Sequence, residues 1–402
     1  MPEALWFTDD EEACKLLADD PFALLVGFAL LAKCIPALYS DYGRVARLRS
    51  PLGYWNELAL LCDAGVPLAL WVAARSRRPR ARVAGVVLLY GLVLTLLLTY
   101  SRFGVALACV AAAAWVFRDR KRVESLAALA IGGGAGIAAF GIGLALPGIT
   151  NDGQPRSVRA HDGWIFALVI VAGAALVAIA ALALEQREVA LEDRARIERI
   201  AGLAALALAV AGLAVSIAFG GRVWSDFTNP GSQLPNNVSH LGSAKSNRWI
   251  WWQEAWHAFT RHPGGGTGAG TFDLAWGAFG DLGRWGGVSD AHSLYLETLA
   301  ELGAVGLVLL AGLVAPVFAA ASQPALSATE TAALGGAVTF LVHAGLDFDW
   351  ELPAVTVAGL ACLAALCVGE RARPAGNYLL FTLMGVEGTT ILGYLVYLIL
   401  HR

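Results

Sequence analysis

The feature that most constrains this chain is a series of apolar segments, each close to the length of a helix that crosses a bilayer. About 20 apolar residues in a helix span the hydrocarbon core of a membrane, and a helix satisfies its own backbone hydrogen bonds there. We predict helices at residues 21–38, 55–74, 83–100, 104–117, 125–147, 163–184, 200–219, 296–321, 330–346, 353–369 and 377–400. The pattern predicts an all-α polytopic membrane protein with about ten or eleven transmembrane helices.

The composition agrees with this fold class. Hydrophobic residues make up 57% of the chain and charged residues only 15%, which excludes an ordinary soluble domain. The net charge of −3 gives no sign of nucleic-acid binding, and we expect no nucleic-acid partner. The six cysteines lie mostly inside apolar segments and suggest neither a disulfide framework nor a metal site. Residues 1–20 are acidic and lack the basic start of a signal peptide, so we expect a cytoplasmic tail.

The distribution of lysine and arginine orients the helices. Alternate loops hold fifteen basic residues, which the positive-inside rule places in the cytoplasm: Arg75, Arg77, Arg78, Arg80, Arg82, Arg118, Arg120, Lys121, Arg122, Arg187, Arg194, Arg196, Arg199, Arg371 and Arg373. The short loops opposite hold six: Arg44, Arg47, Arg49, Arg102, Arg156 and Arg159. This orientation gives a tail at 1–20, helices over 21–219, a large extracytoplasmic loop at 220–295 and further helices over 296–400.

The large loop is expected to contain a helix of its own. Residues at helical spacing place aromatic and basic side chains on one face: Arg248, Trp252, Trp256 and Phe259. Ser246 or Asn247 can cap its start, and the run from His262 to Gly264 ends it. A helix with this many tryptophans favours the membrane–water interface. The tryptophans can anchor the loop there or stack on sugars.

A glycine-rich stretch, PGGGTGAGTF, follows this helix at residues 263–272. It is not a nucleotide-binding loop, because the Gly-Lys-Ser/Thr ending and a preceding strand are missing and the loop is extracytoplasmic. Its glycines, among them Gly268 and Gly270, can present backbone N–H groups to an anion or let a ligand approach closely. A flexible connector is the alternative interpretation.

A histidine, His292, comes just before the next predicted membrane helix. Ser289 or Asp290 is a plausible N-cap, which would place His292 in the first turn. A helix N-terminus disfavours the charged imidazolium, so a histidine there stays neutral, as a general base must be. The alternative is a purely structural histidine.

Three groups of polar residues lie at other outer helix ends. Arg102 stands between two apolar segments, where an arginine either pairs, serves a substrate or reaches back to the interface. Arg49, with its neighbouring arginines, faces either lipid headgroups or substrate. Asp347 and Asp349 form an Asp-x-Asp pair, which either binds a divalent metal or, as we favour, orients a basic partner or caps a helix.

These residues converge on the outer face of the membrane, where a lipid diphosphate ester would need such a set. Arginines hold a diphosphate and offset the charge on a leaving group. A neutral histidine removes a proton from an acceptor hydroxyl. Tryptophans stack on sugars or sit among headgroups. We expect no cofactor.

The sequence resembles the O-antigen ligase and O-antigen polymerase superfamily of bacterial envelope glycosyltransferases. The resemblance covers roughly residues 44 to 369 and is carried by RLRSPLGYWNELAL, by TYSRFG, by NRWIWWQEAWHAFTRHPGGGTGAGTF with DAHSLYLETLAELG, and by HAGLDFDWELP. It implies a metal-independent transferase of the inner membrane that takes glycan from undecaprenyl diphosphate on the extracytoplasmic face. By position, Arg102 and Arg248 match the diphosphate-contacting arginines and His292 matches the candidate base. We add Arg49, Trp252, Gly268 and Gly270 as expected substrate contacts.

The chain also departs from the family pattern. Fewer helices precede the first matched motif, and Phe103 stands where the family more often continues from Ser-Arg directly to Gly. An extra helix pair follows Arg102, and the last predicted helix has no counterpart.

The acceptor stays open, because ligase and polymerase differ in whether a glycolipid or a glycan receives the sugar. A transporter of polyprenyl lipids or solutes is the alternative of another class. It should show internal repeats and interrupted helices.

Overall fold

The structure is a computed structural model that describes residues 21–38, 45–119, 121–185, 190–229, 236–280, 282–323 and 328–368. All regular secondary structure among these residues is helical, which confirms the predicted fold class. The expected cytoplasmic tail, Arg44 and the last predicted helix at 377–400 lie outside the described residues.

Ten of the eleven predicted membrane segments fall among the described residues, and each coincides with helix. The helices before the large loop are α2 (Pro21–Cys34) with η1 (Pro36–Leu38), α3 (Trp55–Arg75), α4 (Pro79–Thr99), α5 (Arg102–Arg118), α6 (Arg122–Ala128), η2 (Leu129–Gly133), α7 (Gly134–Gly143), α8 (Pro147–Thr150), α9 (Arg156–Glu185) and α10 (Leu191–Thr228). After the loop come α14 (Leu294–Ala321), α15 (Ala328–Ala344) and α16 (Pro353–Val368). Five spans among the described residues are long and apolar enough to cross a membrane: α3, α4, α6 to α7, α9 and α14.

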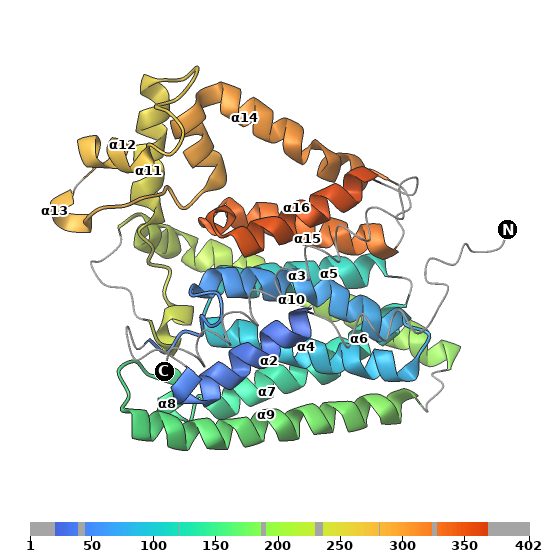
Figure 1. The fold of residues 1–402 in the computed structure, drawn as a ribbon. Helices are drawn as coiled ribbons and strands as arrows, with labels where there is room; N and C mark the ends of the chain where they lie inside the picture. The colour runs from blue at the N-terminus through green and yellow to red at the C-terminus, as the bar shows by residue number, and fades with distance from the viewer. Residues whose placement is uncertain are drawn as a thin grey trace. The chain divides into compact units, whose positions relative to one another are not determined.

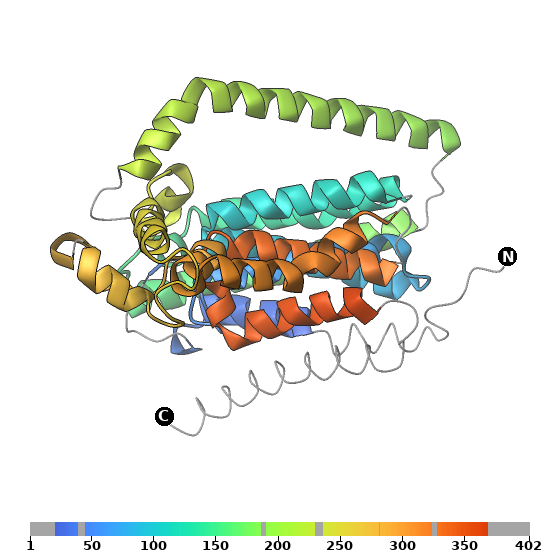
Figure 2. The ribbon, with the colours of Figure 1, turned by 90° about the horizontal axis from the view of Figure 1, so that it is seen from above.

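The described helices divide into two compact units. The first contains α2 to α9, the start of α10 and residues 236–238, and the second contains the rest of α10 and the described residues from 239 to 368. In the first unit, α4 packs against α2, α3, α7 and α9, and the long helices run side by side (Figures 1 and 2). Glycines permit this close packing: a Cβ at Gly85 would lie 2.7 Å from the backbone nitrogen of Ala73 on α3. A Cβ at Gly132 would lie 2.6 Å from the carbonyl oxygen of Val86 on α4.

In the second unit, α14, α15 and α16 pack on one another, and α11 (Arg248–Arg261) packs on α14. The large loop also holds η3 (Val238–Gly242), α12 (Phe272–Phe279) and α13 (Leu282–Trp285), and η4 (Asp349–Glu351) follows α15. A buried cluster joins the loop to α14: Ala255, Ala258, Phe272, Ala275, Trp276, Ala291 and Ala300. The loop is thus a folded part of this unit with its own core.

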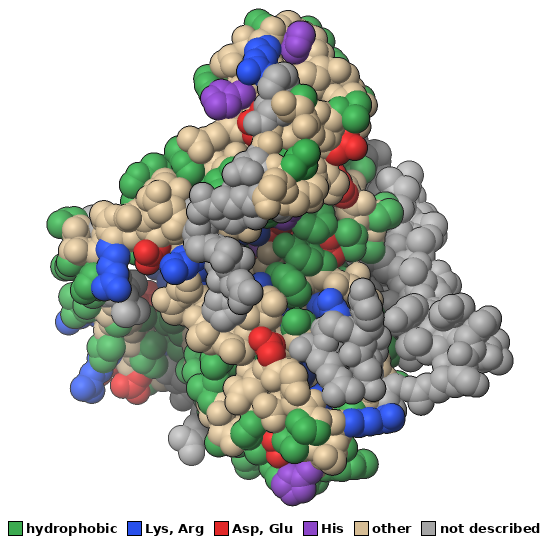
Figure 3. Space-filling view, turned by 90° about the vertical axis from the view of Figure 1, so that its left-hand side faces the viewer, with side chains coloured by type: hydrophobic (Ala, Val, Ile, Leu, Met, Phe, Trp, Pro, Cys, Tyr) green, Lys and Arg blue, Asp and Glu red, His purple; other side chains and the backbone are tan. Residues whose placement is uncertain are grey.

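The predicted loop helix exists as α11, and it runs across the direction of α15 and α16 (Figure 1). That is the orientation of an interfacial helix when α15 and α16 cross the membrane. The face buried against the unit consists of Glu254, Ala255 and Ala258, whereas Trp256 is 51% exposed. Figure 3 shows histidine and basic side chains exposed at the top of the view, at the C-terminal end of α11.

Candidate active site

The backbone before α14 determines where His292 lies. The N-cap of α14 is Ser293, whose hydroxyl accepts from the backbone N–H of Leu296, and His292 precedes it with φ 52°. The prediction that Ser289 or Asp290 caps this helix, with His292 in its first turn, is therefore wrong. The Glu297 carboxylate accepts from the N–H of Ala291 at 2.7 Å and so fixes the backbone just before the helix begins.

Two aromatic rings hold the imidazole of His292. The ring centroid of Trp251 lies 4.1 Å from it and that of Phe348 lies 4.9 Å from it. The indole N–H of Trp252 donates to the backbone carbonyl of His292 at 3.5 Å. The side chain is 15% exposed, and these contacts keep the ring in one orientation.

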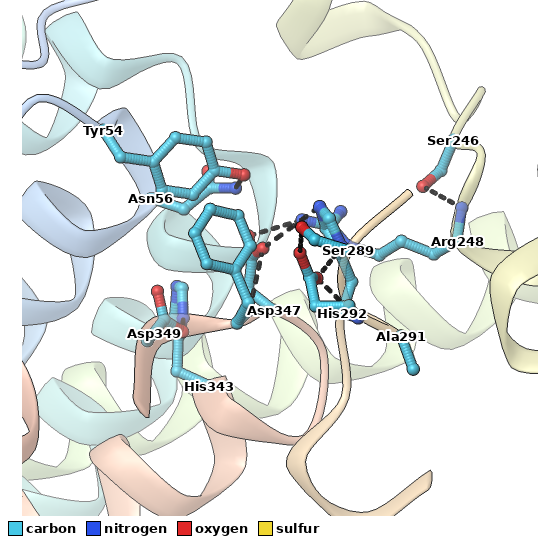
Figure 4. Close-up of polar contacts among 12 residues, drawn as sticks. Tyr54, Asn56, Ser246, Arg248, Ser289, Ala291, His292, His343, Asp347 and Asp349 are labelled. Atoms are coloured by element: carbon cyan, nitrogen blue, oxygen red, sulfur yellow. Dashed lines mark hydrogen bonds and ion pairs between the residues drawn. The ribbon is translucent and has the colours of Figure 1, made fainter. Parts of the chain in front are cut away.

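Arg248 and His292 both point at Asp347 (Figure 4). The guanidinium of Arg248 lies 2.5 Å from one carboxylate oxygen of Asp347, and His292 Nε2 lies 3.9 Å from the other. The three side chains come from the start of α11, the segment before α14 and the segment after α15. Asp347 therefore has a basic partner, as one of the two predictions for the Asp-x-Asp pair requires. Asn247 is the N-cap of α11, and Ser246 Oγ accepts from the N–H of Arg248 at 3.3 Å.

The second aspartate of the Asp-x-Asp pair has a different partner. Asp349 contacts Nδ1 of His343 at the end of α15, and both side chains are buried. Burial raises the pKa of the Asp349 carboxyl, and the adjacent His343 opposes that shift. Each aspartate therefore contacts a basic side chain of the protein.

The glycine-rich stretch is tied to a break in α14. Gly303 has φ 63° and ψ −159°, so the helix is interrupted there. The carbonyls of Ala300 and Glu301, freed by the break, accept from the N–H groups of Thr267 and Gly268 at 3.0 and 2.8 Å. In return, the N–H groups of Ala304 and Val305 donate to the carbonyls of Pro263 and Gly264 at 2.9 and 3.3 Å. The loop thus supplies the backbone hydrogen bonds that the broken helix lacks.

This contact requires glycine on both sides. A Cβ at Gly266 would lie 2.1 Å from the backbone of Glu301, and one at Gly303 would lie 2.5 Å from the carbonyl oxygen of Gly264. Both residues also have positive φ, where a side chain is strained. The stretch is therefore a fitted segment, and the alternative of a flexible connector does not describe it.

The sequence predicts that N–H groups of the glycine-rich stretch can bind an anion. In the structure, the side-chain carboxylate of Glu301 already accepts from two of them. Glu301 accepts from the N–H of Gly270 at 2.8 Å and from that of Phe272, at the start of α12, at 2.9 Å. The N–H of Gly268 donates to the Glu301 backbone carbonyl. Gly268 and Gly270 therefore shape the loop in this structure with their amides already bonded.

The first unit positions the other predicted arginines. Arg102 begins α5 directly after its N-cap Ser101, and both Arg102 and Arg49 are half-buried. Their neighbour Arg47 is 4% exposed, lies over the Trp55 ring at 4.1 Å and donates to the Thr99 carbonyl at 2.9 Å. Of these neighbouring arginines, only Arg49 is predicted from the sequence as a substrate contact, although Arg47 is the more buried of the two.

Two residues at the start of α3 extend the hydrogen-bond network around Arg47. Its guanidinium also donates to Asn56 at 3.3 Å, and the Asn56 amide donates to Tyr54 Oη at 3.0 Å. Figure 4 shows Tyr54 and Asn56 side by side at the start of α3.

These observations define the class of protein: a polytopic, all-α membrane protein whose basic, acidic and aromatic side chains gather in and beside one large loop. Residues 163–311 match the family model described as O-antigen ligase, which confirms the resemblance to the O-antigen ligase and polymerase superfamily. The matched region contains Arg248 and His292. Neither the comparison with curated proteins nor that with solved structures gives a match for this chain.

Proposed function

We propose that this protein is a glycosyltransferase that moves a glycan from an undecaprenyl-diphosphate-linked donor to a hydroxyl acceptor, on the extracytoplasmic face of a bacterial inner membrane, without a metal or cofactor. The family match supports the class of reaction. The observation that carries the proposal is the meeting of Arg248, Asp347 and His292 from three separate segments.

The proposed reaction is one displacement with inversion. His292 takes the proton of the acceptor hydroxyl through a ring nitrogen, and the acceptor oxygen forms a bond to the anomeric carbon. The bond from that carbon to the donor diphosphate breaks, and the lipid diphosphate leaves with the negative charge. Arg248 offsets this charge, and we assign the same role to Arg102 and Arg49 in the first unit. The 2.5 Å contact with Asp347 fixes the position of the Arg248 guanidinium.

Trp252 belongs to the proposed sugar site because it contacts the His292 backbone and begins a chain of rings. Phe227 lies 5.6 Å from Trp252 between ring centroids, and Trp249 and Trp224 extend the group. Aromatic rings suit the flat faces of sugars as well as the interface. Gly268 and Gly270 contribute through the shape of the loop.

Among the described residues, the interruption of α14 favours the transporter, since transporters use broken helices at their binding sites. In this protein the glycine stretch satisfies the freed backbone groups, which suits a structural junction better than an open ion or substrate site. We therefore keep the glycosyltransferase as the proposed function. The acceptor decides between ligase, with a glycolipid, and polymerase, with a glycan.

The proposal is tested with the protein in membranes that contain an undecaprenyl-diphosphate glycan and a panel of glycolipid and glycan acceptors. We expect transfer to the correct acceptor, and a fall of about 10²–10⁴-fold for His292→Ala, the size typical of a lost general base. Arg248→Ala and Arg102→Ala should lower the rate by about 10²–10³-fold. Transfer that survives all three substitutions would contradict the assigned roles. Donor movement across the bilayer without transfer would favour the transporter.

A further inference from the structure

Asp290 lies against the imidazole that the proposed reaction uses as its base. Its carboxylate is 5% exposed and is in ion-pair contact with Nδ1 of His292. One oxygen also accepts from the backbone N–H of His292 at 3.0 Å, and the other accepts from the Ser289 hydroxyl at 3.0 Å. The carboxylate is therefore held in place independently of the imidazole ring.

The backbone of this segment is shaped to make that contact. His292 has φ 52°, a strained conformation for a residue with a side chain, which persists only where the surroundings hold it. The turn from Asp290 to His292 brings the two side chains together across one intervening residue. Glu297 fixes that residue by accepting from the N–H of Ala291 at 2.7 Å.

The two ring nitrogens of His292 have different surroundings: Nδ1 is in close contact with a carboxylate, and Nε2 is not. Among the described residues, Nδ1 makes no aligned hydrogen bond, but it lies beside the Asp290 carboxylate. An unprotonated Nδ1 would face that negative charge with its lone pair, so the proton of the neutral ring is favoured on Nδ1. Nε2 lies 3.9 Å from Asp347, which is beyond hydrogen-bond distance. Asp347 is instead engaged by Arg248 and by the backbone N–H of Phe348 at 3.1 Å. Nε2 therefore keeps its lone pair for an incoming proton.

We propose that Asp290 is the positioning residue of His292. It holds the proton on Nδ1, so that Nε2 is the basic atom, and it stabilises the imidazolium that forms when Nε2 takes the acceptor's proton. This inference rests on the proposed function, in which His292 is the base. Asp290 touches neither donor nor acceptor in this role and acts only through the histidine.

Asp290→Asn tests the inference, because an amide keeps the size of the side chain and loses its charge. An Asn that donates to Nδ1 selects the wrong tautomer, and in a serine protease such a change lowers kcat by about 10⁴-fold. We expect kcat of the purified protein in proteoliposomes to fall by about 10²–10⁴-fold with the donor KM within about threefold. Asp290→Glu should recover at least about tenfold of this loss. Asp273→Asn, at an exposed position of the same loop, is the matched control and should leave kcat unchanged.

The pH–rate profile separates positioning from a purely structural role. The titratable and charged groups near His292 are Asp290 and Glu297 from its own region, Arg248 from α11, and Asp347 and Glu351 around η4. Asp290→Asn removes one negative charge from this set, so the acidic limb of the profile should move to lower pH. An unchanged profile and kcat would overturn the inference.

Two further outcomes distinguish this inference from the proposed function. Loss of activity in His292→Ala with full activity in Asp290→Asn would refute the role of Asp290 and leave the function intact. Full activity in His292→Ala would refute the base itself, and the role of Asp290 with it. Equal loss in the Asn and Glu variants, with a lower Tm and a raised KM in both, would identify Asp290 as structural and overturn the inference.

Discussion

At the scale of single residues, Asp347 lies between Arg248, the proposed diphosphate contact, and His292, the proposed base. Arg248 is 23% exposed and Asp347 only 2%, so a carboxylate left without its arginine would be a nearly buried charge. Removing one partner of a buried pair is strongly destabilising because the other charge is left uncompensated. The two residues should therefore behave as one unit.

A double-mutant cycle tests this coupling. We expect Arg248→Ala and Asp347→Asn each to lower the transfer rate by about 10²-fold or more, and the double variant to be about as active as the worse single one. Rates are measured in proteoliposomes at saturating donor. Losses that multiply in the double variant would show that the two residues act separately.

Some residues of the candidate site could be predicted from the sequence, and others could not. Arg248, His292 and Asp347 stood out because charged side chains are rare in this chain, but their meeting joins positions far apart in sequence, which no local pattern encodes. Asp290 was considered only as a helix cap. Ser293 takes that role, which frees Asp290 for the histidine. The Asp-x-His spacing was the available signal.

At the scale of elements, the junction between the glycine-rich stretch and the break in α14 connects the two ends of the site. The glycine-rich stretch directly follows α11, and Arg248 is the first residue of α11. The stretch is bonded to α14 around its break, and the part of α14 before the break follows the segment that contains His292. The glycines are visible in the sequence, where they predict space for a substrate. The break in α14 could not be predicted, because the apolar pattern of 296–321 continues through Gly303.

The junction predicts a stability difference between two glycines of the same helix. Gly303→Ala places a Cβ 2.5 Å from the Gly264 carbonyl oxygen at a positive φ and should destabilise the protein by about 1–3 kcal/mol. Gly312→Ala, where a Cβ meets nothing within 4 Å, should be neutral or slightly stabilising. Thermal unfolding in detergent measures both. Equal Tm values for the two variants would argue against a tightly fitted junction.

At the scale of the whole molecule, hydrophobic length predicted the helices well. Every predicted segment among the described residues is helical, since a run of apolar residues this long has few other ways to satisfy its backbone. Orientation rests on the basic residues alone and stays a prediction. The contacts of the glycine stretch and the partners of His292 could not be predicted, because they depend on tertiary packing.

Cysteine labelling in intact cells tests the orientation. His257→Cys, exposed on α11, should react with a membrane-impermeant reagent from outside, whereas Arg77→Cys, in a basic loop, should react only after permeabilisation. The unsubstituted chain gives the background from its own cysteines. The reverse pattern would invert the topology and place the candidate site in the cytoplasm.

The central claim is that this protein forms a glycosidic bond at the expense of a lipid diphosphate, with His292 as the base. The most direct measurement follows both products at once in proteoliposomes: the glycosylated acceptor and the released undecaprenyl diphosphate. We predict that they appear in equal amounts, that chelators leave the rate unchanged, and that His292→Ala lowers the formation of both by about 10²–10⁴-fold. Release of lipid diphosphate without a glycosylated product, or equal turnover by His292→Ala, would contradict it.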